Sequence, residues 1–226
     1  FSTVFAFSKR AFPDGRPQPQ TWADFFDATR FPGKRSVYNR PQTVLEAALM
    51  ADGVAPADVY KALSADGGID RAFKKLDEVK PHIVTWWKGA AQPLQMLESG
   101  EVIYASALNG RVSALAEKKM PVEIAWNGGA LMFQYLVIPK GAKDVKGAHE
   151  YIKHTFLDPA ANAEFTRRIK YPGPNPKIYD LLPAALGPTL PTYPANLAAQ
   201  FAFDGGWWSE RLAALQERWT KWLLAR

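Results

Sequence analysis

Residues 86–111, WWKGAAQPLQMLESGEVIYASALNGR, decide the fold of this chain. An aromatic pair opens the stretch, a short helix begins near Pro93, a strand follows over residues 101–107, and a polar NGR sequence at residues 109–111 precedes another helix. Polar groups that follow the carboxyl end of a strand lie where open α/β sheets bind small molecules. The stretch therefore predicts an αβα unit with a polar edge, and a purely structural unit remains the alternative.

The composition is that of a soluble globular protein. Of the 226 residues, 47% are hydrophobic and 22% are charged, which argues against disorder and allows one or two domains. The chain has no cysteine, so disulfides, thiol catalysis and cysteine-based zinc sites are excluded. Apolar runs are interrupted by Lys, Arg or Pro before they reach the length that crosses a bilayer. The lack of cysteine suits an exported bacterial protein and a cytosolic one equally.

The net charge of +6 raises the possibility of a polyanionic partner. Lysine and arginine are spread along the chain among acidic residues, however, and no block of five or six like charges occurs. A basic, aromatic-rich nucleic-acid-binding protein is therefore an alternative and not the main interpretation.

Strands and helices alternate along the chain, which predicts an α/β fold. The opening run FSTVFAFSKR begins directly as a strand, so we expect a processed or truncated piece. The apolar patterns predict strands over residues 1–7, 34–38, 82–85, 101–107, 122–126 and 131–139. They predict helices that start near residues 21, 39 and 56, and others over 69–79, 112–119, 145–157, 159–169, 177–182 and 207–224.

Two features are candidates for ligand contact on their own chemistry. Asn39-Arg40-Pro41 has the character of a helix start, where free N–H groups and the Arg40 side chain suit an anionic group. The alternative is that Arg40 only faces solvent. Gln134 is the polar member of the apolar run at residues 131–139, so it is either a satisfied core group or a ligand contact.

Catalytic motifs are not found in the sequence. His82, His149 and His154 do not have the spacing of a metal-ligand pair, and no nucleophile elbow, P-loop or dinucleotide-binding glycine motif occurs. We therefore expect no enzyme, no cofactor and no metal, with a hydrolase as the less favoured alternative.

Several stretches together resemble one family. The order TWADFFDATRFPGKRSVYNRP, IDRAFKKLDEVKPHIVTWWKGAAQPLQMLESGEV, NGR, IPKGA, YPGPNP and a terminal helix with two adjacent tryptophans is similar to the periplasmic solute-binding proteins of ABC transporters, in the spermidine/putrescine-binding group. The resemblance covers essentially the whole chain.

The resemblance implies an α/β, two-lobed, type II periplasmic binding protein fold whose lobes close on a solute. The first-lobe N-terminal segment of the family is missing, so the first lobe is incomplete. Residues 8–131 and 180–226 are expected to form the second lobe with its C-terminal helices. Residues 1–7 and 132–179 are expected to form hinge strands and the rest of the first lobe.

The family pattern also suggests where the solute lies. The acidic pair that polyamine-binding relatives use falls on Arg40 and Thr43, and a stacking tryptophan falls on Leu108. The Trp and Asp of the second hinge strand fall on Met132 and Gln134. Tyr171 matches its aromatic counterpart, and Trp207 or Trp208 stands where a polar contact is expected. The expected contacts are Tyr38, Asn39, Arg40, Thr43, Trp87, Lys88, Asn109, Arg111, Met132, Gln134, Tyr171 and Trp208.

These substitutions remove carboxylates and add an arginine. Burying the ammonium groups of a polyamine beside Arg40 without a carboxylate would cost several kcal/mol. A carboxylate-bearing solute, amino-acid-like or opine-like, fits a fork from Arg40 and Arg111 better. The resemblance thus predicts a periplasmic, monomeric receptor that delivers a small organic solute to a membrane permease, without nucleic acid or metal.

Overall fold

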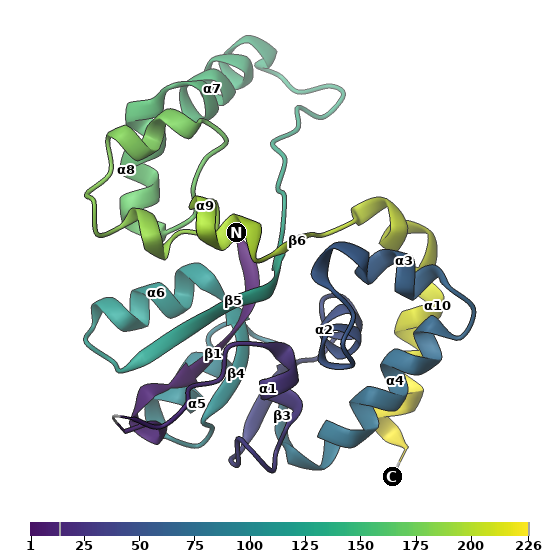
Figure 1. Ribbon diagram of the computed structural model, residues 1–226. Coiled ribbons are helices and arrows are strands. Elements are labelled where there is room, and N and C mark those ends of the chain that lie inside the picture. The colour runs from purple at the N-terminus through teal and green to yellow at the C-terminus, as the bar shows by residue number, and fades with distance from the viewer. Residues whose placement is uncertain (14, 226) are drawn as a thin grey trace.

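One mixed six-stranded sheet forms the centre of the molecule (Figure 1). The computed structural model describes residues 1–13 and 15–225. Within them the strand order is β3-β2-β4-β1-β5-β6, and β1 runs antiparallel to both of its neighbours. The carboxyl ends of β2, β3 and β4 therefore meet at one edge, beside the amino end of β1. The strands are β1 (Ser2–Ser8), β2 (Arg35–Tyr38), β3 (Ile83–Trp87), β4 (Tyr104–Leu108), β5 (Val122–Leu131) and β6 (Phe201–Ala202).

Helices cover both faces of this sheet (Figure 1). One face carries α5 (Gln92–Ser99) and α6 (Asn109–Glu117). The other carries α1 (Trp22–Phe26), α2 (Val44–Ala51), α3 (Val59–Ser64), α4 (Gly68–Val79) and α10 (Gly205–Leu224). Strand β1 lies between the two layers: Phe5 and Phe7 point into the larger core, and Ala6 points into the smaller one. Because both faces are buried, this strand is apolar at successive positions and not at alternate ones.

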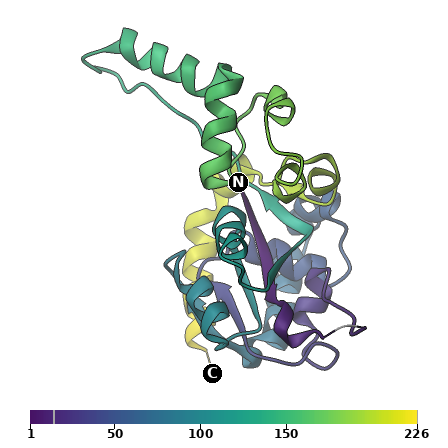
Figure 2. The ribbon, with the colours of Figure 1, turned by 90° about the vertical axis from the view of Figure 1, so that its left-hand side faces the viewer.

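Residues 132–200 form a helical segment that stands apart from the sheet body, which we define as residues 1–131 and 201–225. The segment contains α7 (Val145–Leu157), α8 (Pro159–Ile169) and α9 (Pro194–Ala198), with short 3-10 helices at Pro176–Asp180 and Gly187–Thr189. Figure 2 shows α7 projecting beyond the sheet body. The segment has a small core of its own, built from Ala163, Ile178, Leu182 and Leu190.

Several predictions from the sequence are confirmed. The predicted bounds of α7 and α8 match those observed. Helix α1 begins with the expected capping arrangement: Thr21 accepts a bond from the Asp24 amide, and the Asp24 side chain accepts one from the Thr21 amide. The stretch 86–111 has the predicted order of helix, strand and helix in α5, β4 and α6, but β4 begins at Tyr104 and not at residue 101, and residues 109–111 already belong to α6.

The predicted strand over residues 131–139 is wrong. Strand β5 runs unbroken from Val122 through the predicted glycine loop to Leu131, and residues 132–139 contain no strand. Gly128 allows this because its φ of 71° is available to glycine, and its carbonyl accepts a bond from the Trp22 indole. Tyr135 and Val137 are 81% and 79% exposed. The run has the composition of a strand, but no described strand lies beside it to pair with its backbone.

One predicted helix boundary also needs correction. Helix α2 begins at Val44 and not at Pro41, because Thr43 takes a left-handed conformation with φ 66° and ends the preceding loop. Residues from 180 onward were expected to belong to the second lobe. Leu182 and Leu190 pack against Ala163 on α8, and the chain rejoins the sheet at β6. Arg226, the last residue of that expected range, lies outside the described residues.

No helix within residues 1–13 and 15–225 combines the length and the apolar character that crossing a bilayer requires.

Candidate solute-binding site

Three parallel strands end side by side at one edge of the sheet body. Tyr38 at the end of β2 pairs with Trp87 at the end of β3, while Ser36 pairs with Ala105 of β4. The register brings the segments that follow these strands, residues 39–43, 88–91 and 109–111, to the same edge. The predicted position of the polar NGR sequence at a carboxyl strand edge is thus confirmed.

Two stacked aromatic rings and an arginine lie in sequence at this edge; we call Trp87, Tyr38 and Arg40 the aromatic column. The rings of Trp87 and Tyr38 stack with centroids 3.9 Å apart and planes 6° from parallel. The guanidinium carbon of Arg40 lies 4.0 Å from the Tyr38 centroid, so Tyr38 is held between a ring and a cation. Trp87 is buried, Tyr38 is half-buried and Arg40 is exposed. Among the residues that the structure describes, Arg40 has no carboxylate partner.

Ser106 fixes the column from below. Its Oγ accepts a hydrogen bond from the Trp87 indole at 3.1 Å and another from the Tyr38 amide at 2.9 Å. Ser106 is 2% exposed, so a small hydroxyl here satisfies two buried donors at once. The sequence reasoning missed this residue, since a single serine inside an apolar strand has no distinctive pattern.

The loop at residues 39–43 is held at both ends. The Asn39 amide donates to the Trp87 carbonyl at 2.8 Å, and the Asn39 Oδ1 accepts a bond from the Trp219 indole at 3.1 Å. Thr43 is 7% exposed and has a φ of 66°, a conformation that a β-branched residue adopts only under constraint. Asn39 and Thr43 were expected to contact the solute. Their contacts instead make them supports for the exposed Arg40.

Asn109 is also a support. Its side chain is fully buried; Oδ1 accepts a bond from the Ser2 amide at 2.7 Å, and Nδ2 donates to the Lys170 carbonyl at 3.2 Å. These bonds join α6 to β1 and to the end of α8. Asn109 was expected to contact the solute, but the burial of its amide and both bonds leave it as a joint between the sheet body and the helical segment.

Gly110 on α6 lets the sheet body and the helical segment approach each other closely. A Cβ atom on Gly110 would lie 2.5 Å from Cε1 of Tyr171 and 2.6 Å from the Ile169 carbonyl oxygen. The Tyr171 ring also packs against Phe1, with centroids 5.7 Å apart. Burial raises the pKa of the Tyr171 hydroxyl, and the positive charge of Arg111 opposes that rise. Arg111 itself is exposed, and its charge lies close enough to act on the Tyr171 hydroxyl.

The remaining expected contacts lie in different surroundings. Lys88 is exposed directly after β3, at the strand edge. Met132 is half-buried against the larger core, and its amide donates to the Phe1 carbonyl at 2.8 Å. Gln134 is exposed in the segment without regular structure.

Trp208 requires a correction. Its indole is 2% exposed and donates to Glu46 Oε1 at 2.7 Å. A ring enclosed in this way belongs to the core between α2 and α10, so we leave Trp208 out of the contacts that we propose. The sequence could not reveal this, because an amphipathic tryptophan helix does not show which of its rings face a partner helix.

Glu46 is a second residue that the sequence reasoning missed. It is fully buried, and burial raises the pKa of its carboxyl group to about 7, although bonds from Trp208 and Tyr60 oppose the rise. From the sequence alone, an acidic residue within a helix is expected to face solvent. Only the packing of α2 shows that Glu46 is buried.

The histidines do not form a cluster. His82 lies in the 3-10 turn after α4, whereas His149 and His154 lie on α7 in the helical segment. Within residues 1–13 and 15–225, no group of three or more His, Cys, Asp or Glu side chains is placed to hold a metal.

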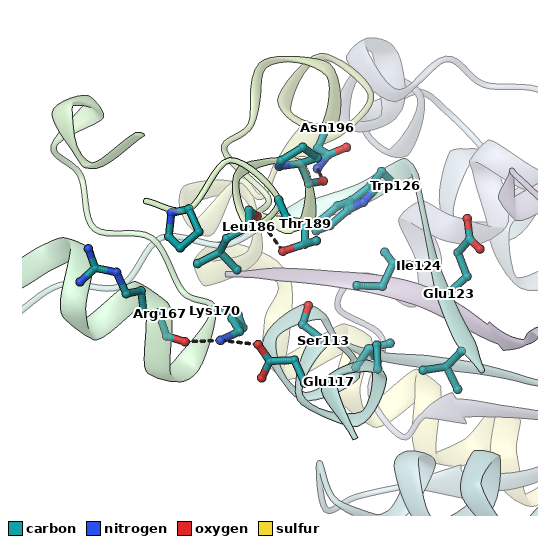
Figure 3. Close-up of a pocket in the computed structure, with 16 residues that line it drawn as sticks. Ser113, Glu117, Glu123, Ile124, Trp126, Arg167, Lys170, Leu186, Thr189 and Asn196 are labelled. Atoms are coloured by element: carbon teal, nitrogen blue, oxygen red, sulfur yellow. Dashed lines mark hydrogen bonds and ion pairs between the residues drawn. The ribbon is translucent and has the colours of Figure 1, made fainter. Parts of the chain in front are cut away.

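A groove of about 820 Å³ lies between α6, β5, the end of α8 and residues 183–196 (Figure 3). Its charged side chains are already paired: Lys170 Nζ lies 2.7 Å from Glu117, Glu123 pairs with Lys9 at 2.9 Å, and Arg167 pairs with Glu164 at 3.0 Å. Arg40 and Arg111 are not among the residues that line it. We therefore place the candidate site at the strand edge and not in this groove.

Comparisons with known proteins agree with this architecture. A family model described as bacterial extracellular solute-binding protein matches residues 1–198. The gamma-aminobutyric acid-binding protein of Pseudomonas aeruginosa is 37% identical over 204 residues, which are 90% of this chain and 57% of the relative. The spermidine/putrescine-binding periplasmic protein 1 of Haemophilus influenzae is 26% identical over 177 residues, 77% of this chain and 47% of the relative.

Solved structures match the fold over almost the whole chain. An ABC transporter substrate-binding protein from Bradyrhizobium japonicum has 40% identity and a TM-score of 0.87, covering 98% of this chain and 67% of that one. The PBP MotA from A. tumefaciens in complex with glucopine has 29% identity and a TM-score of 0.84, covering 99% and 69%.

The chain thus spans about half of the length of the curated relatives and two thirds of the solved neighbours. The predicted α/β fold with an incomplete first lobe and the predicted family are confirmed. The chain belongs to the bacterial extracellular solute-binding proteins.

Proposed function

We propose that this chain is part of a periplasmic receptor that binds a small organic solute through a carboxylate and delivers it to the membrane permease of an ABC transporter. The observation that carries the proposal is the Arg40 guanidinium, stacked on Tyr38 at the strand edge without a carboxylate partner among the described residues. A planar guanidinium offers two parallel donors, which match a carboxylate. Its stacking on Tyr38 fixes the plane before the solute arrives, which lowers the entropic cost of binding.

The charges at the edge favour the carboxylate over a polyamine. Arg40, Lys88 and Arg111 are the exposed charged groups on the segments that follow β2, β3 and β4. An ammonium group brought to this edge would meet cations, whereas a carboxylate would be paired. The names of two of these proteins support the proposal, since a relative binds gamma-aminobutyric acid and a solved neighbour holds glucopine, whereas another relative is named for spermidine and putrescine.

We propose that the direct contacts are Arg40, Arg111 and Tyr171, with Tyr38, Lys88, Met132 and Gln134 around them. Asn39, Thr43, Trp87 and Asn109 hold these groups in place. In this proposal the sheet body is the second lobe, the helical segment belongs to the first lobe, and the solute lies between them. The receptor is monomeric.

Three solutes of similar length test the chemistry. Gamma-aminobutyric acid carries a carboxylate and an ammonium group, 4-aminobutanamide lacks the carboxylate charge, and putrescine carries two ammonium groups. A ligand that binds only the folded state raises the melting temperature, so thermal shift of the full-length protein ranks the three. We expect a shift with the amino acid and none with putrescine. A shift with putrescine alone would refute the carboxylate proposal.

Variants of Arg40 identify the contact. Charge-assisted hydrogen bonds contribute roughly 1.5–3 kcal/mol each, so Arg40→Gln should weaken binding of a carboxylate solute by at least about tenfold. Arg40→Lys keeps the charge but loses the fork, and we expect an intermediate loss. Arg168→Gln, which changes an exposed arginine on α8, is the matched control and should leave the affinity unchanged.

Within the part of the chain that the structure describes, no observation favours a basic nucleic-acid-binding protein or a hydrolase over the receptor.

A further inference from the structure

Helix α10 reaches the solute-binding loop, which we define as residues 39–43, through one tryptophan. The Trp219 indole N–H donates a hydrogen bond to Asn39 Oδ1 at 3.1 Å, across 180 positions of the chain. Trp219 is fully buried, so the bond runs from the interior of the sheet body to the residue that precedes Arg40. A residue near the end of the chain therefore contacts the loop that carries the proposed solute contact.

The turn at Asn39 sets the direction of the Arg40 side chain. The Arg40 amide donates to the Tyr38 carbonyl at 2.9 Å, which closes a three-residue turn with Asn39 at its centre. The turn brings the Arg40 guanidinium back over the Tyr38 ring, 4.0 Å from its centroid. A displacement of Asn39 would therefore move the base of the Arg40 side chain away from this ring.

Helix α10 is itself anchored along α4 (Figure 1). The Trp222 indole donates to Asp77 on α4 at 2.7 Å, and Lys80, directly after α4, donates to the Trp222 carbonyl at 2.6 Å. The Trp219 ring packs against Phe73 on α4, with centroids 6.4 Å apart. These contacts fix the last turns of α10, so the Trp219 indole holds the loop from a fixed position.

Two tryptophans of α10 differ mainly in the partner of the indole N–H. Trp219 and Trp222 are three positions apart, so they lie on the same face of the helix. Both rings pack edge-on against Trp86 with centroids 5.4 Å apart. The Trp219 indole bonds to Asn39 in the loop, whereas the Trp222 indole bonds to Asp77 on α4. Trp222 is therefore a matched control for Trp219.

We propose that Trp219 is a positioning residue for solute binding, whose indole bond to Asn39 holds the solute-binding loop so that Arg40 stays stacked on Tyr38. The inference rests on the proposed function, because it takes Arg40 as the contact to the solute carboxylate. A guanidinium that is held in one plane before the solute arrives loses less conformational entropy on binding. Without the indole bond, Asn39 keeps only its backbone bond to Trp87, and Arg40 samples more orientations.

The first test compares two variants of α10 in the full-length protein. Trp219→Phe keeps an aromatic ring but removes the bond to Asn39, and we expect the affinity for gamma-aminobutyric acid to fall at least about threefold, within the usual contribution of one hydrogen bond. Trp222→Phe removes the bond to Asp77 and should leave the affinity unchanged, even where the melting temperature falls. Unchanged affinity in Trp219→Phe, or an equal loss in both variants, would overturn the inference.

A change on the loop side removes the same bond without altering the core. Asn39 is half-buried, so Asn39→Ala leaves the packing of α10 intact, and we expect it to lower the affinity as much as Trp219→Phe does. Two changes that remove one contact are not additive, so the double variant should bind as weakly as either single variant and no more weakly. Full additivity would mean that Asn39 acts on the solute directly, and it would overturn the inference.

A second measurement needs no solute. The Arg40 Nε–H proton lies over an aromatic ring, so its NMR shift in the solute-free protein reports the stacking on Tyr38. Tyr38→Leu, which has no ring, gives the unstacked reference. Trp219→Phe should move the shift toward this reference, and Trp222→Phe should not. If no solute of the panel binds but the shift moves, the proposed function fails while the positioning by Trp219 stands. If the shift does not move in Trp219→Phe, the positioning fails whatever the solute.

Discussion

Replacing Asn109 with alanine should damage the joint between the sheet body and the helical segment. The change removes the acceptor of the Ser2 amide and the donor to the Lys170 carbonyl at a fully buried position. A buried group left without its partner costs about 1–3 kcal/mol. Two such groups give an expected loss of roughly 2–6 kcal/mol in the free energy of unfolding, a large part of the stability of an ordinary domain.

Urea unfolding followed by tryptophan fluorescence measures this loss. Asn127→Ala, at an exposed position on β5, is the matched control and should stay within about 0.5 kcal/mol of wild type. If Asn109 were only a solute contact, Asn109→Ala would lower solute affinity and leave the unfolding curve unchanged. That result would refute the reasoning about the joint.

Further variants probe the same edge and its support. Gly110→Ala should destabilise the protein by more than about 2 kcal/mol in urea unfolding, because its Cβ would lie 2.5 Å from the Tyr171 ring; a neutral result would show that the ring moves freely. Ser106→Ala should cost about 2 kcal/mol or more in thermal unfolding, since it leaves the buried Trp87 indole without its acceptor; an unchanged melting temperature would contradict the role of the hydroxyl. The folded-state pKa of Glu46 is raised from 4.5 to about 7, so the free energy of unfolding should fall by about 3 kcal/mol as pH rises between these values and stay level above them. The titration is absent in Glu46→Gln, so an equal pH slope in this variant would assign it to another group.

Much of the sheet body could be predicted from the sequence, because its elements follow local rules. The capping pair Thr21 and Asp24 sets the start of α1, and the apolar face of α4 predicts that helix within one residue. The NGR sequence after β4 lies at the carboxyl edge because parallel strands end together. Patterns of this kind need only the residues within one or two elements.

The errors come from contacts between distant residues. The run at residues 132–139 has strand composition, but strand formation needs a neighbouring backbone that the described residues do not supply. The sequence predicts that α2 starts at Pro41, yet residues 39–43 form bends and turns, with the Asn39 amide bonded to the Trp87 carbonyl and Thr43 in a left-handed conformation just before Val44.

The residues of the candidate site also differ in how far the sequence identifies their surroundings. The places of Arg40 and Arg111 directly after strand ends could be predicted from the sequence and are observed, whereas their contact with the solute stays a prediction. Asn109 and Trp208 were expected to face the solute, but their polar atoms bond to residues more than 60 positions away. No pattern along the chain shows which polar side chains are already satisfied.

A crystal structure of the full-length protein with the solute that raises its melting temperature most tests the central claim directly. We expect a solute carboxylate within about 2.7–2.9 Å of the Arg40 guanidinium, the separation of a charge-assisted hydrogen bond, with the Arg40 side chain still stacked on Tyr38. A solute whose ammonium group faces Arg40, or one bound in the groove beside α6 with the strand edge open to solvent, would contradict the account.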